Sequence, residues 1–339
     1  MCTALSIKSD EGKYFFGRNM DLAYTFNQAV MIIPKSFQFK DKVTGNMITN
    51  NRAIIGMGTV IDNHPTIADG MNENGLACAG LNFAGYAYWE KEPVEGKTNI
   101  GPYDFIQWVL SNHDTIEEVK KDIENIELVD IPLNEKTPCP TLHWMISDKT
   151  GKSIVVEKTK NKFAFYDNTV GVMTNNPTFD WHLTNLNEYL YLTPNYPNDT
   201  KWSDQELTPL GIGAGSLGIP GDFAPASRFV RIAYIRAHMT SVKNDIQAVT
   251  QFFHMLDYVK MVKGGVITKD GLEDLTLYSS CMDQQEGIYY YKSYDNNRIS
   301  AVDMKKEKLE GKELKIFPYP TTQDINYQNQ NIINRYLCN

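Results

Sequence analysis

Short apolar runs separated by turn residues dominate the first hundred positions of the chain. The runs KYFF, AVMIIP and AIIGMGTVI have the length and residue types of β-strands, and the segment KVTGN has turn chemistry. In MNENGLACAGLNF, Asn74-Gly75 can take the positive φ angles of a tight hairpin, which places Asn82 at the far end of the next strand. This region therefore predicts consecutive antiparallel hairpins.

A helical period replaces this pattern in PYDFIQWVLSN and TIEEVKKDIENI. In the second segment apolar residues recur every three or four positions, and Thr115 with Glu118 forms a predicted capping box. Strands return in LHWMISDKTGKSIVVEKTKNKFAFYDN and in the following VGVMTNNP. Helical patterns then cover residues 178–192, 226–240 and 245–259, and a last set of strands follows in LTLYSSCMD, GIYYYKSYD and RISAVDM.

This order of elements predicts an α+β fold in which two stacked antiparallel sheets are flanked by helices, formed by residues 1–339 as a single domain. Two segments stand outside it. Residues 191–222 are rich in Pro, Gly and Asp and are expected to form a long functional or interfacial loop, because the entropy of ordering such a loop must be offset by contacts. Residues from about 320 to 339 are polar and rich in Asn and Gln, which predicts a surface tail.

Charge and hydropathy narrow the class of partner. The chain of 339 residues has a formal net charge of −8, whereas nucleic acids and anionic membranes attract basic surfaces. No run approaches the roughly 20 apolar residues of a spanning helix, and the N-terminus lacks the pattern of a signal peptide. We therefore expect a cytoplasmic protein that acts on a small molecule.

The cysteines and histidines do not form a metal-binding or disulfide pattern. Five cysteines are scattered along the chain without a CxxC pair, and six histidines are equally dispersed. This usage suits a reducing compartment. The sequence therefore predicts neither a metal nor another cofactor.

Cys2 stands directly behind the initiator methionine. If Met1 is removed, this residue carries a free α-amine beside its thiol. An α-amine has a reference pKa of about 7.7–8.0, so one residue can supply both the nucleophile and the base that activates it. Cys2 is therefore a candidate N-terminal nucleophile.

Four residues elsewhere have the chemistry that such a nucleophile needs. Asp21 is placed to orient the amine, and Arg18 in GRNMD is placed to stabilise the thiolate. Asn82 and Asn175, each at the end of a predicted strand, are candidate donors to an oxyanion.

Arg228, near a predicted helix start in FAPASRFVRIAYIR, is a candidate fixed cation at the same centre. Taken singly, these residues have ordinary explanations as surface and turn residues, and Cys78 is best interpreted as a small buried apolar residue. The functional hypothesis depends on their combination.

Several longer motifs resemble one known family. The segments MCTAL, FGRNMD, ADGMNENGLACAGLNF, LHWMISDKTGKSIVVE, TNNPTFDWH and PGDFAPASRF resemble the choloylglycine hydrolases, most of all the bile salt hydrolases of Gram-positive bacteria, from Met1 to about Pro318. The resemblance implies an N-terminal nucleophile hydrolase with a four-layer αββα sandwich. It also implies catalytic roles for Cys2, Arg18, Asp21, Asn82, Asn175 and Arg228.

The resemblance further implies an apolar pocket for a steroid. The matching positions are Met20, Ile61, Ala68, Leu133, Thr137 and Leu142. Ile61 and Thr137 depart from the family, in which an aromatic residue and a larger aliphatic residue are common there. A homotetramer is implied as well, with the loop at 191–222 resembling the family's assembly loop.

The resemblance makes amide hydrolysis of glycine- or taurine-conjugated bile salts through a Cys2 thioester the expected function. One alternative is penicillin V acylase activity, which the family performs with the same machinery. Penicillin V acylases of the family tend to have Tyr where this chain has Asn82, which favours bile salts. A second alternative is a non-catalytic module that binds amphipathic ligands.

Overall fold

Two large antiparallel sheets form the centre of the molecule. The computed structural model describes residues 1–330. The first sheet contains, in spatial order, β14 (Val172–Met173), β1 (Cys2–Lys8), β2 (Tyr14–Leu22), β18 (Glu273–Asp283), β19 (Ile288–Ser293) and β20 (Ser300–Asp303), with β17 (Val266–Ile267) paired to β18. The second contains β13 (Phe163–Asp167), β12 (Ser153–Lys158), β11 (Leu142–Ser147), β8 (Ala77–Asn82), β7 (His64–Asn72), β6 (Ile54–Ile61), β3 (Ala29–Ile33) and β21 (Lys315–Ile316).

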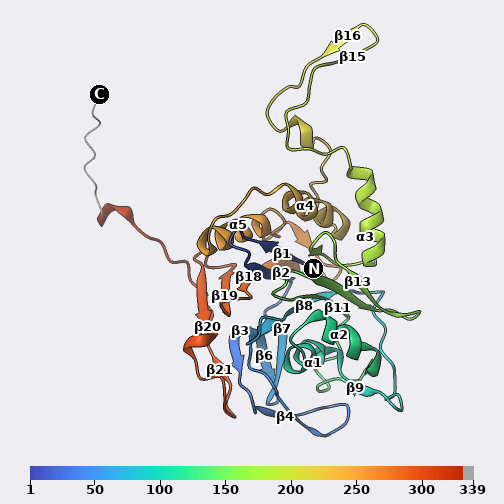
Figure 1. Cartoon of the computed structure of the whole chain (residues 1–339), viewed down its shortest axis with the longest axis vertical. Helices are drawn as coiled ribbons and strands as arrows, with labels where there is room; N and C mark the ends of the chain where they lie inside the picture. The colour runs from blue at the N-terminus through green and yellow to red at the C-terminus, as the bar shows by residue number, and fades with distance from the viewer. Residues whose placement is uncertain (331–339) are drawn as a thin grey trace.

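Helices cover the outer face of each sheet (Figure 1). The first sheet is covered by α4 (Pro225–His238) and α5 (Asp245–Asp257), and the second by α1 (Phe105–Asn112) and α2 (Ile116–Asp122). The helix α3 (Phe179–Asn185) lies beside α4. The predicted four-layer sandwich is therefore confirmed.

The alternation of side chains along the strands gives the molecule two apolar cores. On β12, Val155 packs between the sheets, whereas Ile154 and Val156 face the layer of α1 and α2. On β8, Ala79 likewise packs between the sheets, whereas Cys78 faces the layer of α1 and α2. These two central strands, β8 and β12, are therefore buried on both faces, which explains the consecutive apolar residues in their sequences.

Smaller elements complete the described chain. Three two-stranded pairs are β4 (Gln38–Lys40) with β5 (Met47–Thr49), β9 (Thr98–Ile100) with β10 (Ile126–Leu128), and β15 (Thr200–Trp202) with β16 (Gln205–Leu207). Short 3₁₀ turns lie at Pro102–Asp104, Ile123–Asn125, Leu186–Tyr189, Ala214–Ser216, Met304–Lys306 and Gln328–Gln330.

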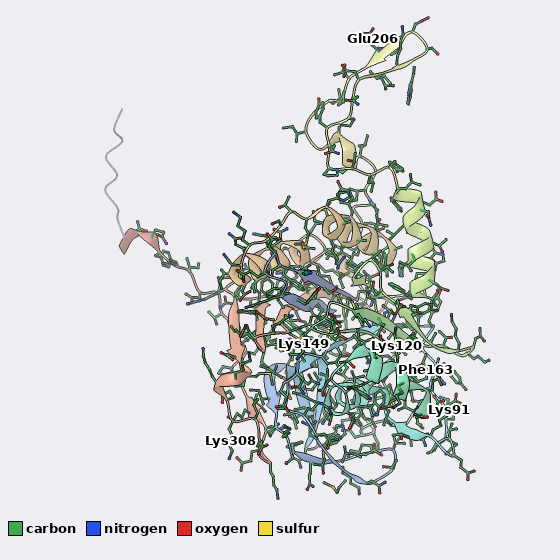
Figure 2. All side chains as sticks on the ribbon, viewed as in Figure 1. Lys91, Lys120, Lys149, Phe163, Glu206 and Lys308 are labelled. Carbon is green, nitrogen blue, oxygen red and sulfur yellow. The ribbon has the colours of Figure 1, made fainter. Side chains whose placement is uncertain are left out.

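The segment at 191–222, which we predicted to be a long loop, contains some regular structure. It contains the hairpin of β15 and β16, which projects away from the sandwich (Figure 1). Figure 2 shows Glu206 near its outer end, far from the two sheets. Apolar side chains on this segment are exposed, with Leu210 and Ile212 among them.

Two other local predictions were partly wrong. The helix expected over 178–192 ends at Asn185 and continues as a 3₁₀ turn. Thr115 does accept from the N–H of Glu118, but the Glu118 carboxylate accepts from the N–H of Asp114 and not from that of Thr115.

The expected surface tail is exposed at residues 321–329, and 331–339 lie outside the described residues.

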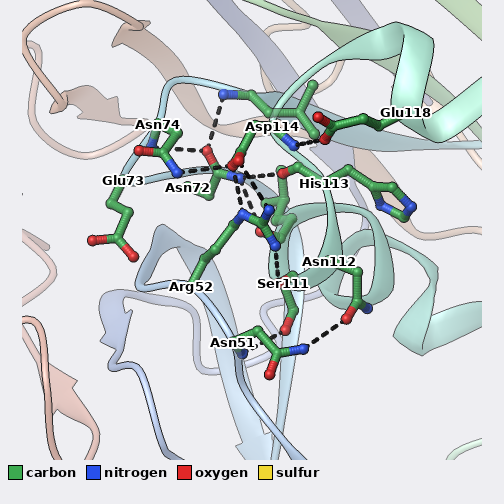
Figure 3. A network of polar contacts seen from close by, with 12 residues as sticks. Asn51, Arg52, Asn72, Glu73, Asn74, Ser111, Asn112, His113, Asp114 and Glu118 are labelled. Atoms are coloured by element: carbon green, nitrogen blue, oxygen red, sulfur yellow. Dashed lines mark hydrogen bonds and ion pairs between the residues drawn. The ribbon is translucent and has the colours of Figure 1, made fainter.

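The turn between β7 and β8 is attached to the end of α1 (Figure 3). Gly75 alone takes a positive φ angle there, 86°, while Asn74 does not, contrary to our expectation. Arg52 pairs with both carboxylate oxygens of Asp114, at 2.5 and 2.9 Å, and donates to the carbonyl of Ser111 at 2.9 Å. This polar cluster, the Arg52 cluster, fixes the second sheet against its helix layer.

Candidate active site

The pairing of β1 with β2 brings the predicted nucleophile beside its predicted partners. Cys2 lies opposite Met20, and Ala4 lies opposite Arg18. The Cys2 Sγ is 4.0 Å from the Met20 Sδ. The FGRNMD segment therefore lies along the N-terminal strand because a tight antiparallel hairpin joins the two.

The Arg18 guanidinium is buried between the two sheets. Its Nη1 donates to the carbonyls of Gly80 at 2.5 Å and Ala68 at 3.3 Å, and its Nη2 lies 3.4 Å from Met20 Sδ. Ala68 is an extra residue in β7, at the point where the pairing with β6 shifts register, so its carbonyl is directed out of the regular ladder. A fixed positive charge therefore lies next to the thiol.

Burial disfavours the charged form of Arg18, but the net effect of its surroundings is to raise its pKa. Cys2 makes the largest favourable contribution, followed by Tyr278 and Asp69. The charge of this side chain therefore persists in the dry space between the sheets.

Asp21 is fully buried at the end of β2. Its Oδ1 accepts from the Thr276 hydroxyl at 2.5 Å, while its Oδ2 has no hydrogen-bond partner among the described residues. Burial raises the pKa of this carboxyl, and the N-terminal amine and Arg228 act in the opposite direction. The Asp21 N–H donates to the Met1 carbonyl at 2.9 Å, so this carboxylate adjoins the residue that precedes Cys2.

Met1 is attached to Cys2 in this structure and occupies the position beside Asp21. Its amine donates to the Asp21 carbonyl at 2.7 Å and to the Asp274 carboxylate at 3.2 Å. The Cys2 nitrogen is accordingly a peptide N–H, and the Cys2 residue is only 3% exposed. In this form the thiol lacks the free amine that our hypothesis requires.

The Asn175 side chain connects three of the predicted site residues. Its Oδ1 accepts from the Cys2 N–H at 2.8 Å and from Arg228 Nη2 at 2.6 Å. Its Nδ2 donates to the backbone carbonyl of Asn82 at 2.8 Å. The orientation of the Asn175 amide is therefore defined by contacts at both ends, with the oxygen toward the N-terminus.

Arg228 reaches this centre from the first turn of α4. Its Nη1 donates to the Cys2 carbonyl and to the Thr3 hydroxyl, both at 2.6 Å, and its Nε donates to the Phe223 carbonyl at 3.0 Å. Burial lowers its pKa, partly offset by Asp21 and Cys2. This guanidinium holds the backbone of the nucleophile in place.

The structure thus gathers five of the six predicted catalytic side chains at one centre. Asn82 also reaches it, but through its backbone carbonyl. Its side chain is exposed, and Asn82 Oδ1 accepts from the Thr141 hydroxyl at 2.9 Å. This side chain lies at the border of the site with solvent.

The six predicted pocket residues divide into two groups. Met20 and Ala68 contact Arg18, and Leu142 pairs with Asn82 across β11 and β8. The other three come from two loops, Ile61 at the tip of β6 and Leu133 with Thr137 in the segment before β11. The loops are joined by a hydrogen bond of 2.5 Å from Asn134 Nδ2 to Asp62 Oδ2, so they lie side by side.

Sequence reasoning missed a buried carboxylate next to the site. Asp69 accepts hydrogen bonds from the hydroxyls of Tyr278, Ser280 at 2.8 Å and Tyr289 at 2.7 Å. Burial raises the pKa of its carboxyl, and Arg18 is the main opposing influence. Its position between the sheets was not apparent because β7 also contains the polar residues His64, Thr66 and Asn72, and no pattern marks which of them faces the other sheet.

Two buried histidines, His143 and His182, were also missed. They donate to the backbone carbonyls of Thr174 at 2.9 Å and Asn175 at 2.8 Å. Both lie inside motifs that the sequence analysis used, LHWMISD and TNNPTFDWH. Their presence within these motifs could have marked them as candidate site residues, but the sequence does not indicate what they contact.

With this geometry established, comparison with known proteins decides the family. The family model for linear amide C-N hydrolases, choloylglycine hydrolase family, matches residues 2–317. The chain belongs to this family. The predicted resemblance is confirmed, and this choloylglycine hydrolase family member is a linear-amide hydrolase with the fold of the N-terminal nucleophile hydrolases.

Individual relatives match along nearly the whole chain. The bile salt hydrolase/transferase of Clostridium perfringens (strain 13 / Type A) is 51% identical over 331 residues, which cover 97% of this chain and 100% of that protein. The bile salt hydrolase/transferase of Lactiplantibacillus plantarum is 40% identical, with 96% and 99% covered. The crystal structure of the C2A mutant of the conjugated bile acid hydrolase from Clostridium perfringens superposes with a TM-score of 0.92 at 50% identity, covering 97% of this chain and 100% of that one.

No metal site or membrane span accompanies this centre in the part of the chain that the structure describes. Among residues 1–330 no group of His, Cys, Asp and Glu side chains is arranged to hold a metal ion. Within the same range no helix combines the length and the apolar character needed to cross a bilayer.

Proposed function

We propose that this enzyme hydrolyses the amide bond of glycine- or taurine-conjugated bile salts through a thioester on Cys2. The observation that carries the proposal is the convergence of Cys2, Arg18, Asp21, Asn175 and Arg228 at one buried centre. The relative at 51% identity is named for activity on bile salts, which supports this substrate class.

The first step of the mechanism is removal of Met1. A peptide nitrogen is not basic, so only a free Cys2 amine can accept the thiol proton. The buried and unpartnered Asp21 Oδ2 supports this step, because an ammonium group formed at Cys2 would give that oxygen a partner. Active protein is therefore expected to begin at Cys2, as intact mass measurement can test.

Acylation then proceeds in a balanced sequence. The Cys2 sulfur attacks the carbonyl carbon of the amide while the thiol proton passes to the α-amine. The amide oxygen becomes an oxyanion, to which Asn175 Nδ2 donates a hydrogen bond, and the exposed Asn82 side chain supplies a second donor, Nδ2, by turning toward the centre. When the carbon–nitrogen bond breaks, the α-ammonium returns the proton to the leaving glycine or taurine nitrogen, which leaves a thioester on Cys2.

Deacylation uses the same groups with water. The α-amine takes a proton from a water molecule, and the resulting hydroxide attacks the thioester carbon. Collapse of the second oxyanion releases the bile acid and restores the Cys2 thiolate, which is reprotonated by the α-ammonium. Arg18 and Arg228 stabilise the negative charge at sulfur and oxygen throughout.

The substrate assignment rests further on the mouth of the site. Met20 and Ala68 contact Arg18, Leu142 pairs with Asn82, and the loops that carry Ile61 and Leu133 are joined by the bond from Asn134 to Asp62. Apolar side chains at these positions suit the steroid of a bile salt, with its amide at Cys2.

We also propose a cytoplasmic homotetramer. The number of exposed apolar side chains on the projecting segment 191–222 supports assembly, because an interface would remove them from water. The free thiols of Cys2, Cys78, Cys139 and Cys281 support a reducing compartment. Mass measurement under native conditions tests the tetramer.

A turnover assay on Met1-free protein tests the substrate class. We expect a higher kcat/KM for glycocholate or taurocholate than for penicillin V. Asn82→Tyr should shift this ratio toward penicillin V, because a phenol narrows the mouth of the site where the smaller amide leaves room for a steroid. A wild-type preference for penicillin V would reject the bile-salt assignment while keeping the cysteine mechanism.

The non-catalytic alternative is tested by covalent labelling. The proposed enzyme forms an adduct on Cys2 with a thiol-reactive substrate analogue, as intact mass shows. Reversible binding without turnover or adduct would instead identify a module that binds amphipathic ligands.

A further inference from the structure

We propose that His182 is a positioning residue of this hydrolase, acting through the backbone of Asn175. This inference rests on the proposed catalytic role of Asn175. The imidazole N–H of His182 fixes the segment that carries the Asn175 amide, and thereby the amide that receives Cys2 and Arg228.

Asn175 is held in place by contacts outside the regular sheet. The antiparallel pairing between β14 and β1 ends at Met173, so Asn175 lies beyond the regular ladder. Its carbonyl accepts from His182 Nε2 at 2.8 Å, and the preceding carbonyl, of Thr174, accepts from His143 Nε2 at 2.9 Å. Two imidazole groups from separate elements thus take the place of ladder hydrogen bonds at consecutive residues.

The contact defines the protonation state of His182. A carbonyl oxygen only accepts, so Nε2 carries the hydrogen. The Nδ1 atom is buried without a partner among the described residues, and burial lowers the pKa of this imidazole to about 4. At neutral pH His182 is therefore a neutral donor whose second nitrogen carries no proton, which suits a fixed structural contact and not proton transfer.

The His182 ring is itself held by the helix that carries Arg228. It stacks on Phe229 with ring centroids 4.6 Å apart and an interplanar angle of 13°. Phe229 follows Arg228 directly in α4, and Arg228 donates to Asn175 Oδ1 at 2.6 Å. His182 therefore links the backbone of Asn175 to the helix turn from which Arg228 reaches its side chain.

This linkage matters for catalysis because the Asn175 amide has two functions in the proposed mechanism. Its oxygen holds the Cys2 nitrogen, and its Nδ2 is a donor to the oxyanion. Displacement of a donor by a fraction of an ångström weakens stabilisation in the transition state more than it weakens binding of the ground state. Loss of the His182 contact should therefore lower kcat and leave KM nearly unchanged.

Two substitutions of His182 separate the effect of its hydrogen bond to Asn175 from the effect of its stacking on Phe229. His182→Phe keeps a ring to stack on Phe229 but removes the N–H, whereas His182→Gln keeps an N–H donor and removes the ring. We expect His182→Phe to lower kcat about 10-fold or more, with KM within about twofold of wild type. His182→Gln should retain kcat within about threefold. The exposed His254, changed to Phe, is the matched control and should leave both constants unchanged.

The outcomes discriminate between positioning and general destabilisation. Equal losses of kcat in His182→Phe and His182→Gln, or a wild-type kcat in His182→Phe, would overturn the proposal. In an Asn175→Ala background, His182→Phe should cause no further loss of kcat, because the group that it positions is absent. An additive loss would likewise reject it.

A readout independent of turnover keeps this proposal distinct from the proposed function. In protein labelled with ¹⁵N-asparagine, we expect the Asn175 side-chain amide resonance to shift in His182→Phe and to stay near its wild-type position in His182→Gln. An unchanged resonance in His182→Phe would overturn the positioning role, whether or not the enzyme cleaves bile salts. Failure of wild type to cleave any bile salt would reject the proposed function alone.

Discussion

Buried or half-buried arginines occur both in the Arg52 cluster and at the catalytic centre, but their hydrogen-bond partners differ. In the Arg52 cluster, just before the start of β6, the guanidinium is half-buried and forms an ion pair with both carboxylate oxygens of Asp114 (Figure 3). At the catalytic centre, Arg18 and Arg228 are fully buried, and their hydrogen-bond acceptors are backbone carbonyls, a hydroxyl and an amide. No ion pair joins either of them to a carboxylate in the described part of the chain.

This difference in partners determines whether a guanidinium charge can act on a reacting group. A carboxylate partner, as Asp114 is for Arg52, neutralises the guanidinium and raises its pKa. Carbonyl and amide partners satisfy the N–H groups of Arg18 and Arg228 without cancelling their charge. A negative charge that develops on sulfur or oxygen at the centre therefore meets guanidinium groups that are not held in an ion pair, in a dry site where electrostatic interactions are strong.

The largest expected effect is that of Cys2→Ala. This change removes the nucleophile, so turnover of conjugated bile salts should fall by at least about 1000-fold, while the circular dichroism spectrum stays that of wild type. Cys2→Ser should leave trace activity, because a hydroxyl is a poorer nucleophile with the same base. Residual activity of Cys2→Ala above a few per cent would contradict the mechanism.

Arg228→Met should have the next largest effect. It removes the charge and leaves the Cys2 carbonyl and Asn175 Oδ1 without this donor, so we expect kcat/KM to fall about 100-fold or more. The matched control is Arg52→Met, which should keep kcat/KM at the wild-type value. If both variants lost activity equally, the distinction between the two clusters would be wrong.

The pH dependence of the free energy of unfolding should reveal the burial of His182. Its pKa is lowered from 6.5 to about 4 in the folded protein, so the neutral form is favoured by folding. This contribution to stability is present above about pH 6.5 and is lost as pH falls toward 4, and it amounts to about 3 kcal/mol. His182→Phe should therefore show a smaller decrease in the free energy of unfolding over this range, as urea denaturation at several pH values can measure.

The smallest expected effect is that of Arg52→Met on stability. The partly exposed pair with Asp114 should contribute about 1 kcal/mol at neutral pH, because solvent screens it. Arg52 lowers the pKa of the Asp114 carboxyl, so the contribution is present above the unfolded pKa of about 4 and is lost as pH falls below it. Urea denaturation should show a larger difference between wild type and variant at pH 7 than at pH 3.

The parts of the fold that depend on local apolar patterns could be predicted from the sequence, and other parts could not. The four layers could be predicted because the periods of the apolar positions differ between strands and helices. The hairpin in 191–222 could not, since its strands are exposed and polar and carry no alternating apolar pattern. The helix from 178 ends at Asn185 although the pattern continues, because helix ends depend on local backbone contacts more than on periodicity.

The sequence by itself determined the nucleophile and the residues closest to it. Cys2 is defined by its position behind Met1, and a hairpin between β1 and β2 necessarily returns Arg18 and Asp21 to the N-terminus. Such a contact depends on alternation and on a short turn, both of which are properties of neighbouring residues.

Only the tertiary structure decided how the remaining residues meet Cys2. Asn175 and Arg228 reach it across 173 and 226 positions of the chain, and the contact of His182 with the Asn175 carbonyl depends on how α3 packs beside α4. The structure also decided that Asn82 joins the centre through its carbonyl while its side chain faces solvent. Such choices depend on the packing of whole layers, because burial requires every polar group between the sheets to find a partner, and no local pattern specifies which partner that is.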